Sequence, residues 1–320
     1  MAGIATDRHD QQEPDQWAPR HSLNVARGGL AGAVLHGQIF VMGGFSSGHS
    51  AELDSVEAHD PNTDTWRLVA PMPTGRGDLA AAAADGRIYA IGGLSGASVL
   101  AVVEAYEPTA NNWAMVAPLP TPRGWVGAAA VSDRIYVVGG GDHFGGEDHR
   151  LDVYDVAADR WHTAAPMPTA REALKLTELQ GQLYAIGGRD KNGTNRLSAV
   201  ERYNPHQDSW EAVRSMGTER ENPGVATVGE RIFAVGGVGN DGGLQTGEVY
   251  DPNTDQWRSL VVQFSTTRAS LVATHGHGDD GHGDDGLGDG EVILAIGGFA
   301  GGGATREATN RVEALRLPHS

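Results

Sequence analysis

The sequence predicts an all-β chain in which six similar units of about 48 residues close into a ring. Three observations lead to this prediction. Gly-Gly doublets end short apolar runs six times, a tryptophan follows five of the doublets after 21 to 23 residues, and an arginine follows each of these tryptophans after ten or eleven residues. Recurrence at a fixed spacing of this length is typical of repeat architectures, in which each unit is one small supersecondary structure.

Each unit has the composition of four short strands. An inner strand follows the arginine, a second ends in Gly-Gly, a third carries the pattern Val-Glu-x-Tyr, and a fourth surrounds the tryptophan. The runs are β-branched and aromatic, and Gly, Pro, Asn and Asp bound them. A single four-stranded sheet has two faces and two edges to cover, and radial stacking against neighbouring sheets covers the faces. The doublets are Gly43-Gly44, Gly92-Gly93, Gly139-Gly140, Gly187-Gly188, Gly236-Gly237 and Gly297-Gly298.

The two ends of the chain are predicted to complete one unit together. The last unit reads "NRVEALRLPHS" and has no tryptophan, whereas "EPDQWAPR" near the start contains Trp17, ten residues before Arg27. Residues 13–22 therefore supply the outer strand of the sixth sheet, and residues 1–12 are a polar tail. The repeats cover residues 13–317 as one domain.

These motifs resemble the kelch repeat. The resemblance covers nearly the whole chain, with small departures: Asp152 replaces Glu and Val156 replaces Pro in the third unit, and His59 replaces Tyr in the first. It implies a six-bladed β-propeller with four antiparallel strands per blade, closed by the N-terminal outer strand.

Composition excludes several functions. The chain has no cysteine, so thiol catalysis and thiolate metal sites are excluded. The formal charge of −17 disfavours nucleic acid and anionic membranes as partners. Neither a run of about 18 apolar residues nor a secretory signal is present, so we expect a cytoplasmic protein.

The residues that recur in every unit are predicted to be structural. Each repeat arginine is expected to pair with the acid of the third strand, and each repeat tryptophan to fill the wedge between adjacent sheets. The alternative for the arginines is a ring that binds carboxylates or phosphates. The set comprises Arg27, Arg76, Arg123, Arg171, Arg220 and Arg268; Glu57, Glu104, Asp152, Glu201, Glu248 and Glu313; and Trp17, Trp66, Trp113, Trp161, Trp210 and Trp257.

The candidate binding residues are those that break the symmetry. The loops after the doublets differ freely, and variable loops on a regular frame are where binding usually occurs. Equivalent positions near the channel mouth carry Asp78, Trp125, Asn222 and Ser270, and Trp125 is the one tryptophan outside the repeat pattern. The loops add His143, Phe144, Arg189, Lys191, Asn240 and Asp241.

Two segments hold weak candidates for metal ligands. These are Asp142 and His149 in the third loop, and His275, His277 and His282 in "HGHGDDGHGDDGLGDG" at 275–290, an insertion within the sixth unit. Glycine leaves such ligands unpositioned, so we expect no metal and no other cofactor.

The predicted function is non-catalytic binding of a protein or peptide at the variable-loop face. No catalytic residue is assigned, because no catalytic motif occurs. Two alternatives stay open: a kelch enzyme similar to a sialic-acid mutarotase, and a carbohydrate-binding module in which Trp125 stacks on a sugar. A copper site like that of galactose oxidase requires a cysteine and is excluded, which leaves a propeller similar to that of galactose oxidase without its copper.

Overall fold

The computed structural model describes residues 16–47, 51–61, 63–141, 149–190, 194–261, 263–277, 291–301 and 307–317. Within these residues the chain forms six four-stranded antiparallel sheets and three smaller ones. The four-stranded sheets are β2 (Ala31–Leu35), β3 (Gln38–Met42), β4 (Val56–Asp60) and β5 (Thr65–Val69); β6 (Ala80–Ala84), β7 (Arg87–Ile91), β10 (Val103–Glu107) and β11 (Asn112–Met115); β12 (Gly127–Val131), β13 (Arg134–Val138), β14 (Leu151–Asp155) and β15 (Arg160–Ala164); β16 (Lys175–Leu179), β17 (Gln182–Ile186), β18 (Val200–Asn204) and β19 (Ser209–Val213); β20 (Gly224–Val228), β21 (Arg231–Val235), β24 (Gly247–Asp251) and β25 (Gln256–Ser259); and β27 (Val272–His277), β28 (Glu291–Ile296), β31 (Val312–Arg316) and β1 (Ala18–Arg20).

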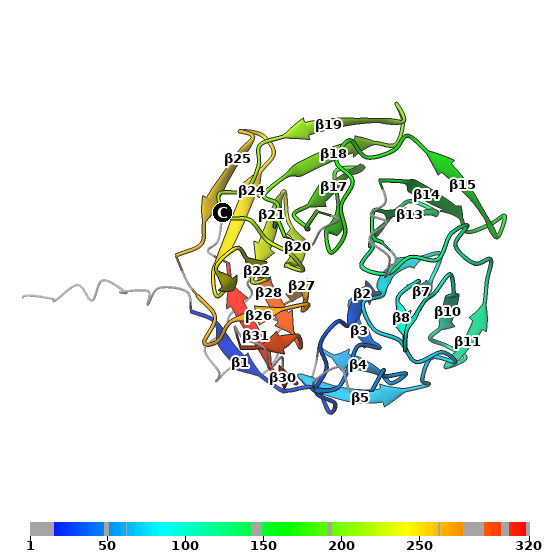
Figure 1. The fold of residues 1–320 in the computed structure, drawn as a ribbon. Coiled ribbons are helices and arrows are strands. Elements are labelled where there is room, and N and C mark those ends of the chain that lie inside the picture. Colours follow the sequence, from blue (N-terminus) through cyan, green and yellow to red (C-terminus); the bar gives the residue numbers. More distant parts are fainter. Residues whose placement is uncertain are drawn as a thin grey trace, which may run out of the picture.

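The first strands of these sheets are neighbours in a circle. β2 lies beside β6, β6 beside β12, β12 beside β16, β16 beside β20, β20 beside β27, and β27 beside β2. The outer strands β5, β11, β15, β19, β25 and β1 lie at the periphery (Figure 1). The sheets are therefore arranged radially, as the repeat pattern predicts.

One sheet takes its outer strand from the other end of the chain. β1 pairs antiparallel with β31, with Ala18 opposite Ala314 and Arg20 opposite Val312. Next to this strand, the Leu23 N–H donates to the carbonyl of Asn310 at 2.9 Å. This is the pairing that the isolated Trp17 segment predicts.

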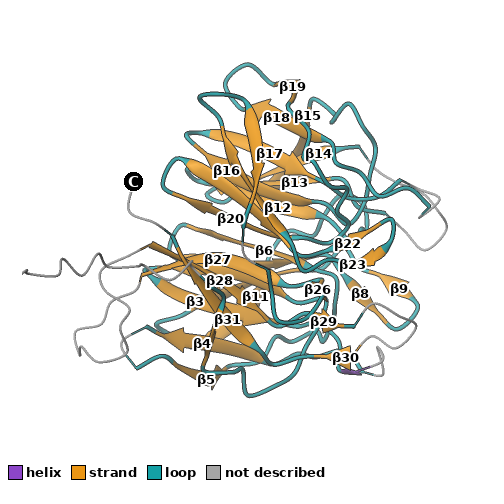
Figure 2. Cartoon of the chain, turned by 90° about the vertical axis from the view of Figure 1, so that its left-hand side faces the viewer, coloured by secondary structure: helices purple, strands orange, loops and turns teal. Residues whose placement is uncertain are grey.

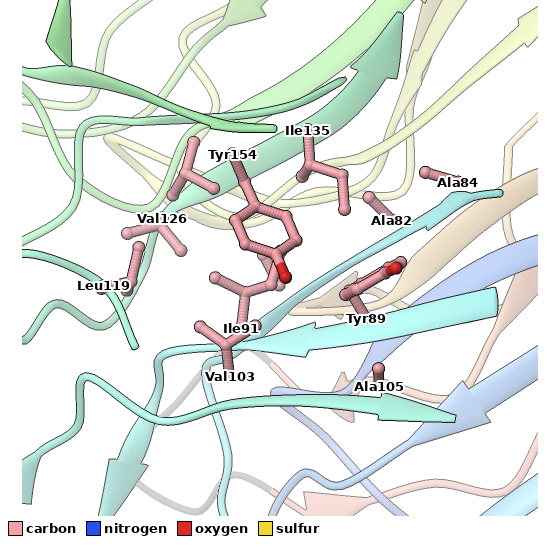
Figure 3. Close-up of a cluster of buried hydrophobic side chains, with 12 residues drawn as sticks. Ala82, Ala84, Tyr89, Ile91, Val103, Ala105, Leu119, Val126, Ile135 and Tyr154 are labelled. Carbon is pink, nitrogen blue, oxygen red and sulfur yellow. The ribbon is translucent and has the colours of Figure 1, made fainter. Parts of the chain in front are cut away.

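The core consists of buried side chains between successive sheets. In one cluster, Ile91 and Val103 of one sheet face Ile135 and Tyr154 of the next (Figure 3). A cluster of this kind lies between every pair of successive sheets, including the last and the first. Packing between sheets, rather than within one, holds the units together.

A repeated set of hydrogen bonds, here called the clasp, joins successive outer strands. In the third sheet, Trp161 Nε1 donates to the Ala117 carbonyl of the preceding sheet at 2.8 Å. The Ala117 N–H and the Tyr154 hydroxyl both donate to Asp159 Oδ1, at 2.8 and 2.6 Å. The same three donors recur with Trp113, Ala70, Tyr106 and Asn111; with Trp210, Ala165, Tyr203 and Asp208; and with Trp257, Arg214, Tyr250 and Asp255.

The first sheet uses a histidine in its clasp. His59 stands where four of the other sheets have tyrosine, and its Nε2 lies 2.9 Å from Asp64 Oδ1. His21, directly after β1, lies 3.2 Å from the other carboxylate oxygen, and Trp66 Nε1 donates to its carbonyl. This departure from the repeat therefore keeps the clasp and ties the first sheet to the segment that closes the last one.

The predicted insertion begins later than the sequence indicates. β27 extends to His277, and His275, Gly276 and His277 pair with Ile293, Val292 and Glu291 of β28. The first three residues of the 275–290 segment are thus strand, because β28 has a matching extension at its start. Residues 278–290 lie outside the described part of the chain. Among the described residues, no helix has the length and hydropathy needed to cross a membrane.

Candidate functional site

The loops that follow the Gly-Gly doublets lie on one face of the molecule. Their short strands are β8 (Leu94–Ser95) with β9 (Ser98–Val99), β22 (Val238–Gly239) with β23 (Gly242–Gly243), and β29 (Phe299–Ala300) with β30 (Glu307–Ala308) and β26 (Arg268–Ala269). In Figure 2 these small sheets gather at the same side of the large ones. The opposite side carries the short hairpin turns.

Six residues, here called the mouth residues, surround the opening on this face. They are Gly29, Asp78, Trp125, Ala173, Asn222 and Ser270, and each has a positive φ between 47° and 67°. The N–H of each donates to the carbonyl of the one before it, at 2.7 to 3.0 Å, and Gly29 donates to Ser270. The six hydrogen bonds form a complete circle of main-chain atoms, so the frame of the mouth does not depend on its side chains.

Trp125 is the bulkiest of the mouth residues and the one least suited to this backbone. A bulky residue at positive φ is rare, and such a conformation costs on the order of 1–3 kcal/mol, so it persists where the surroundings enforce it. The Trp125 side chain packs against the buried cluster of Phe45, Leu94 and Phe299. The guanidinium of Arg189 lies over the Trp125 ring, 5.8 Å from its centroid. The partly exposed indole therefore contacts both an apolar cluster and a cation.

The repeat arginines lie beneath the mouth and are paired as the sequence predicts. Arg76 Nη1 lies 2.5 Å from Glu104 Oε2, with both side chains fully buried. The other pairs are Arg27–Glu57, Arg123–Asp152, Arg171–Glu201, Arg220–Glu248 and Arg268–Glu313, at 2.5 to 3.1 Å. Burial lowers the pKa of Arg76, and the charge of Glu104 opposes that effect. Buried, paired guanidinium groups of this kind support the structural role rather than the anion-binding alternative.

A second ring of six residues, here called the rim residues, follows the doublets: Phe45, Leu94, Gly141, Arg189, Val238 and Phe299. Each of three rim side chains occupies the space above a glycine of the next unit. A Cβ has no room at Gly28 beneath Phe299 or at Gly77 beneath Phe45, and at Gly124 it would lie tightly against Leu94. Where the next unit has Glu221 instead of glycine, the rim residue is Arg189, and the two form an ion pair at 2.7 Å. These rim residues therefore fit the residue that each meets in the next unit, by size at the glycines and by charge at Glu221.

One side of the rim is charged. Arg189 lies 2.7 Å from Glu172 and 2.7 Å from Glu221, and Arg196 Nε lies 3.1 Å from Glu221. Burial lowers the pKa of Arg189, but the charges of Glu221 and Glu172 outweigh this and raise it. The opposite side, with Phe45, Leu94 and Phe299, is apolar. The mouth thus lies between an apolar arc and an arc of ion pairs.

A cavity of about 90 Å³ continues inward from the mouth, along the inner strands. Its lining consists of Ala, Gly, Val and Leu side chains, together with Lys175. A second space of about 10 Å³, lined by Asp78, Trp125, Asn222 and Ser270 among others, lies at the mouth itself and also reaches Lys175. The larger of the two spaces is therefore mainly apolar, and Lys175 borders both.

The kelch motif model matches five segments, at residues 26–73, 75–120, 122–168, 174–217 and 219–261. This chain belongs to the kelch family. The structure entitled "Structure of YjhT" is similar to it, with a TM-score of 0.74 and 15% sequence identity over 92% of this chain and 99% of that one. No curated protein matches the chain. At this identity the structural similarity shows the kelch fold.

The remaining predicted binding residues of this kelch chain lie apart from the mouth or outside the described residues. Asn240 and Asp241 are exposed in the turn between β22 and β23, and Asn240 Oδ1 accepts from the Arg196 N–H at 3.4 Å. His143, Phe144 and Lys191 lie outside the described residues. The structure therefore brings together Asp78, Trp125, Asn222, Ser270 and Arg189, with Asn240 nearby.

The weak metal candidates do not form a cluster within the described residues. His275 and His277 lie in β27, and His149 is exposed, with its carbonyl accepting from the Met167 N–H. Asp142 and His282 lie outside the part of the chain that the structure describes.

Sequence reasoning missed Glu172, Glu221 and Lys175. A signal for the two glutamates exists, because they directly follow the repeat arginines Arg171 and Arg220, where the first three units have glycine. A signal for Lys175 exists too, since it stands four residues after Arg171, where the other units have Ala31, Ala80, Gly127, Gly224 and Val272. Alignment of the units by their arginines reveals all three.

Proposed function

We propose that this kelch protein binds a protein or peptide partner across the face where the variable loops meet, with Trp125 as the central anchor. The six sheets then act as the blades of one closed six-bladed propeller, whose role is to hold the mouth and rim in place. The circle of main-chain hydrogen bonds through the mouth residues supports this arrangement.

The observation that carries the proposal is the packing of Trp125. Its indole is partly exposed, yet it packs against the apolar cluster and lies under the guanidinium of Arg189. Rigid aromatic side chains near the centre of an interface contribute much of the binding free energy, because little conformational entropy is lost when they are covered. Polar and charged groups around such an anchor, here Asp78, Arg189 and Arg196, fix orientation and specificity.

A comparison of two variants tests the proposal. In Trp125→Asn, the new residue is compatible with the backbone, since Asn222 has the same conformation at the equivalent position. Arg231→Ala changes an exposed residue at the start of β21, on the opposite face. Proteins captured from cell extract by the wild type are identified by mass spectrometry, and the affinity of each purified partner is then measured for all three proteins.

We expect Trp125→Asn to weaken binding at least tenfold, which corresponds to about 1.4 kcal/mol, and Arg231→Ala to leave it within about twofold, as is usual away from the interface. Equal affinity of the wild type and Trp125→Asn, or an equal loss in both variants, would show that the partner binds elsewhere.

A further inference from the structure

Lys175 is the residue that departs most from the symmetry of the channel. It is the first residue of β16, and its equivalents in the other inner strands are Ala31, Ala80, Gly127, Gly224 and Val272. A long side chain at a position where the other strands have small ones extends into the space that those residues leave. Lys175 lines both the cavity of about 90 Å³ and the narrow space at the mouth.

The Lys175 amine differs from the buried repeat arginines in its polar contacts. The repeat arginines each lie within 3.1 Å of a carboxylate oxygen. Among the described residues, the Lys175 amine has no hydrogen bond or ion pair, and the charge that acts on it is that of Asp78 at the mouth. Because Lys175 is partly exposed and lines the cavity, its free surface faces the channel.

The surroundings favour the neutral form of this amine. Removal from water lowers the pKa of Lys175, and the negative charge of Asp78 only partly opposes this. A neutral lysine is a nucleophile, and lysines in apolar pockets form imines with carbonyl compounds for this reason.

We propose that Lys175 is a reactive amine that binds a small aldehyde or ketone covalently, as an imine, inside the channel. The amine nitrogen attacks the carbonyl carbon and forms a C–N bond. The carbonyl oxygen then leaves as water with the two hydrogens of the amine, and a C=N bond remains. No oxidant or reductant is needed, and the reaction reverses by addition of water.

The size of the channel restricts the carbonyl compound. The space at the mouth has a volume of about 10 Å³ and the cavity that shares Lys175 with it about 90 Å³, so only a small molecule fits beside the amine. The cavity holds a few non-hydrogen atoms, and its alkyl lining offers no partner for a phosphate or a second charge. A short, uncharged aldehyde fits these limits, whereas pyridoxal phosphate does not.

The chain offers an internal reference for the test, since Lys175 and Lys191 are its two lysines. The full-length protein is treated with propanal and sodium cyanoborohydride, which reduces the imine to a stable amine, and labelling at both lysines is quantified by peptide mass spectrometry. The same reaction in urea gives the labelling ratio of the unfolded chain. At pH 7 we expect the ratio of Lys175 to Lys191 to be at least tenfold higher in the folded protein, with no such preference for pyridoxal phosphate.

Two variants test whether the labelling depends on the charge of Asp78 and on Lys175 itself. Asp78→Asn removes the charge that favours the ammonium form, and Asn222 shows that asparagine fits the backbone there, so labelling of Lys175 is expected to rise severalfold at pH 6.5 without a change at Lys191. Lys175→Ala copies Ala31 and Ala80 and is expected to fold and to lose the label. A folded-state ratio at or below that of the unfolded chain, an equal preference for both aldehydes, or no rise in Asp78→Asn would overturn the proposal.

Discussion

At the scale of single residues, the contribution of an arginine–glutamate ion pair to stability depends on whether the pair is buried. Arg76 is fully buried and paired with Glu104, whereas Arg202 pairs with Glu211 at the surface. Removing one member of a buried pair leaves an uncompensated charge, and this costs far more than loss of an exposed pair.

Glu104→Gln is therefore expected to lower the free energy of unfolding by about 3–5 kcal/mol, because Arg76 stays charged and buried. Glu211→Gln is the matched control, with an expected loss below about 1 kcal/mol. Urea unfolding followed by tryptophan fluorescence measures both. Losses of equal size would argue against a structural role for the buried pairs.

At the scale of elements, the clasp links neighbouring outer strands through an aspartate or asparagine at five junctions in the described part of the chain. Hydrogen bonds to the ionised carboxylate lower the pKa of Asp159, where the Tyr154 hydroxyl has the largest effect. They also lower the pKa of Asp208 and Asp255, where the backbone N–H of Ala165 or Arg214 contributes most. The second sheet has Asn111 at this place and makes the same bonds without a titrating group.

The clasps are therefore expected to weaken in acid. A carboxylate with a lowered folded-state pKa stabilises the fold above the ordinary aspartate pKa of about 3.9, and this contribution is lost as the pH falls through the lowered value. A triple variant, Asp159→Asn, Asp208→Asn and Asp255→Asn, copies the second sheet. Its melting temperature should fall less steeply than that of the wild type between about pH 5 and pH 2. Parallel curves for the two proteins would rule out the clasps as the acid-sensitive groups.

At the scale of the whole molecule, β1 completes the last sheet by pairing with β31. Beside it, Trp17 stacks on Phe264 with ring centroids 4.3 Å apart, and this contact joins the fifth and sixth sheets. The last sheet has Leu315 where four others have the clasp tyrosine, so it lacks that hydroxyl donor. The N-terminal segment thus contributes much of the contact at this junction.

Deletion of residues 1–20 is expected to lower the melting temperature by on the order of 10 °C, from the loss of about 3–5 kcal/mol for a packed tryptophan at about 2–4 °C per kcal/mol. The free edge of β31 should also promote aggregation. Deletion of residues 1–12 alone, which spares β1, is the control and should leave the melting temperature unchanged. An unchanged value for the longer deletion would show that β1 is dispensable.

The sequence predicts contacts within a repeat better than contacts between repeats. The pairs of arginine and acid follow from a shared period, and the pairing of β1 with β31 follows from the missing tryptophan. Alignment of the units marks Glu221 and Lys175 as departures from the repeat, but the ion pair of Arg189 with Glu221 and the cavity beside Lys175 depend on how one sheet faces the next, which a linear period does not specify. The extent of β27 differs from the prediction for a related reason, because composition marks an insertion but not where hydrogen bonding stops.

The circle of main-chain hydrogen bonds at the mouth has a consequence for how the binding specificity of such proteins can change. Closure there uses no side-chain atoms, so a change of side chain at one of the six positions leaves the hydrogen-bonding groups of the frame in place. The left-handed backbone favours glycine, asparagine and aspartate, and a bulky side chain needs a supporting neighbour, as Trp125 has in Arg189. New specificity is therefore expected to arise through paired substitutions in adjacent units, and a library for directed evolution should vary those positions together.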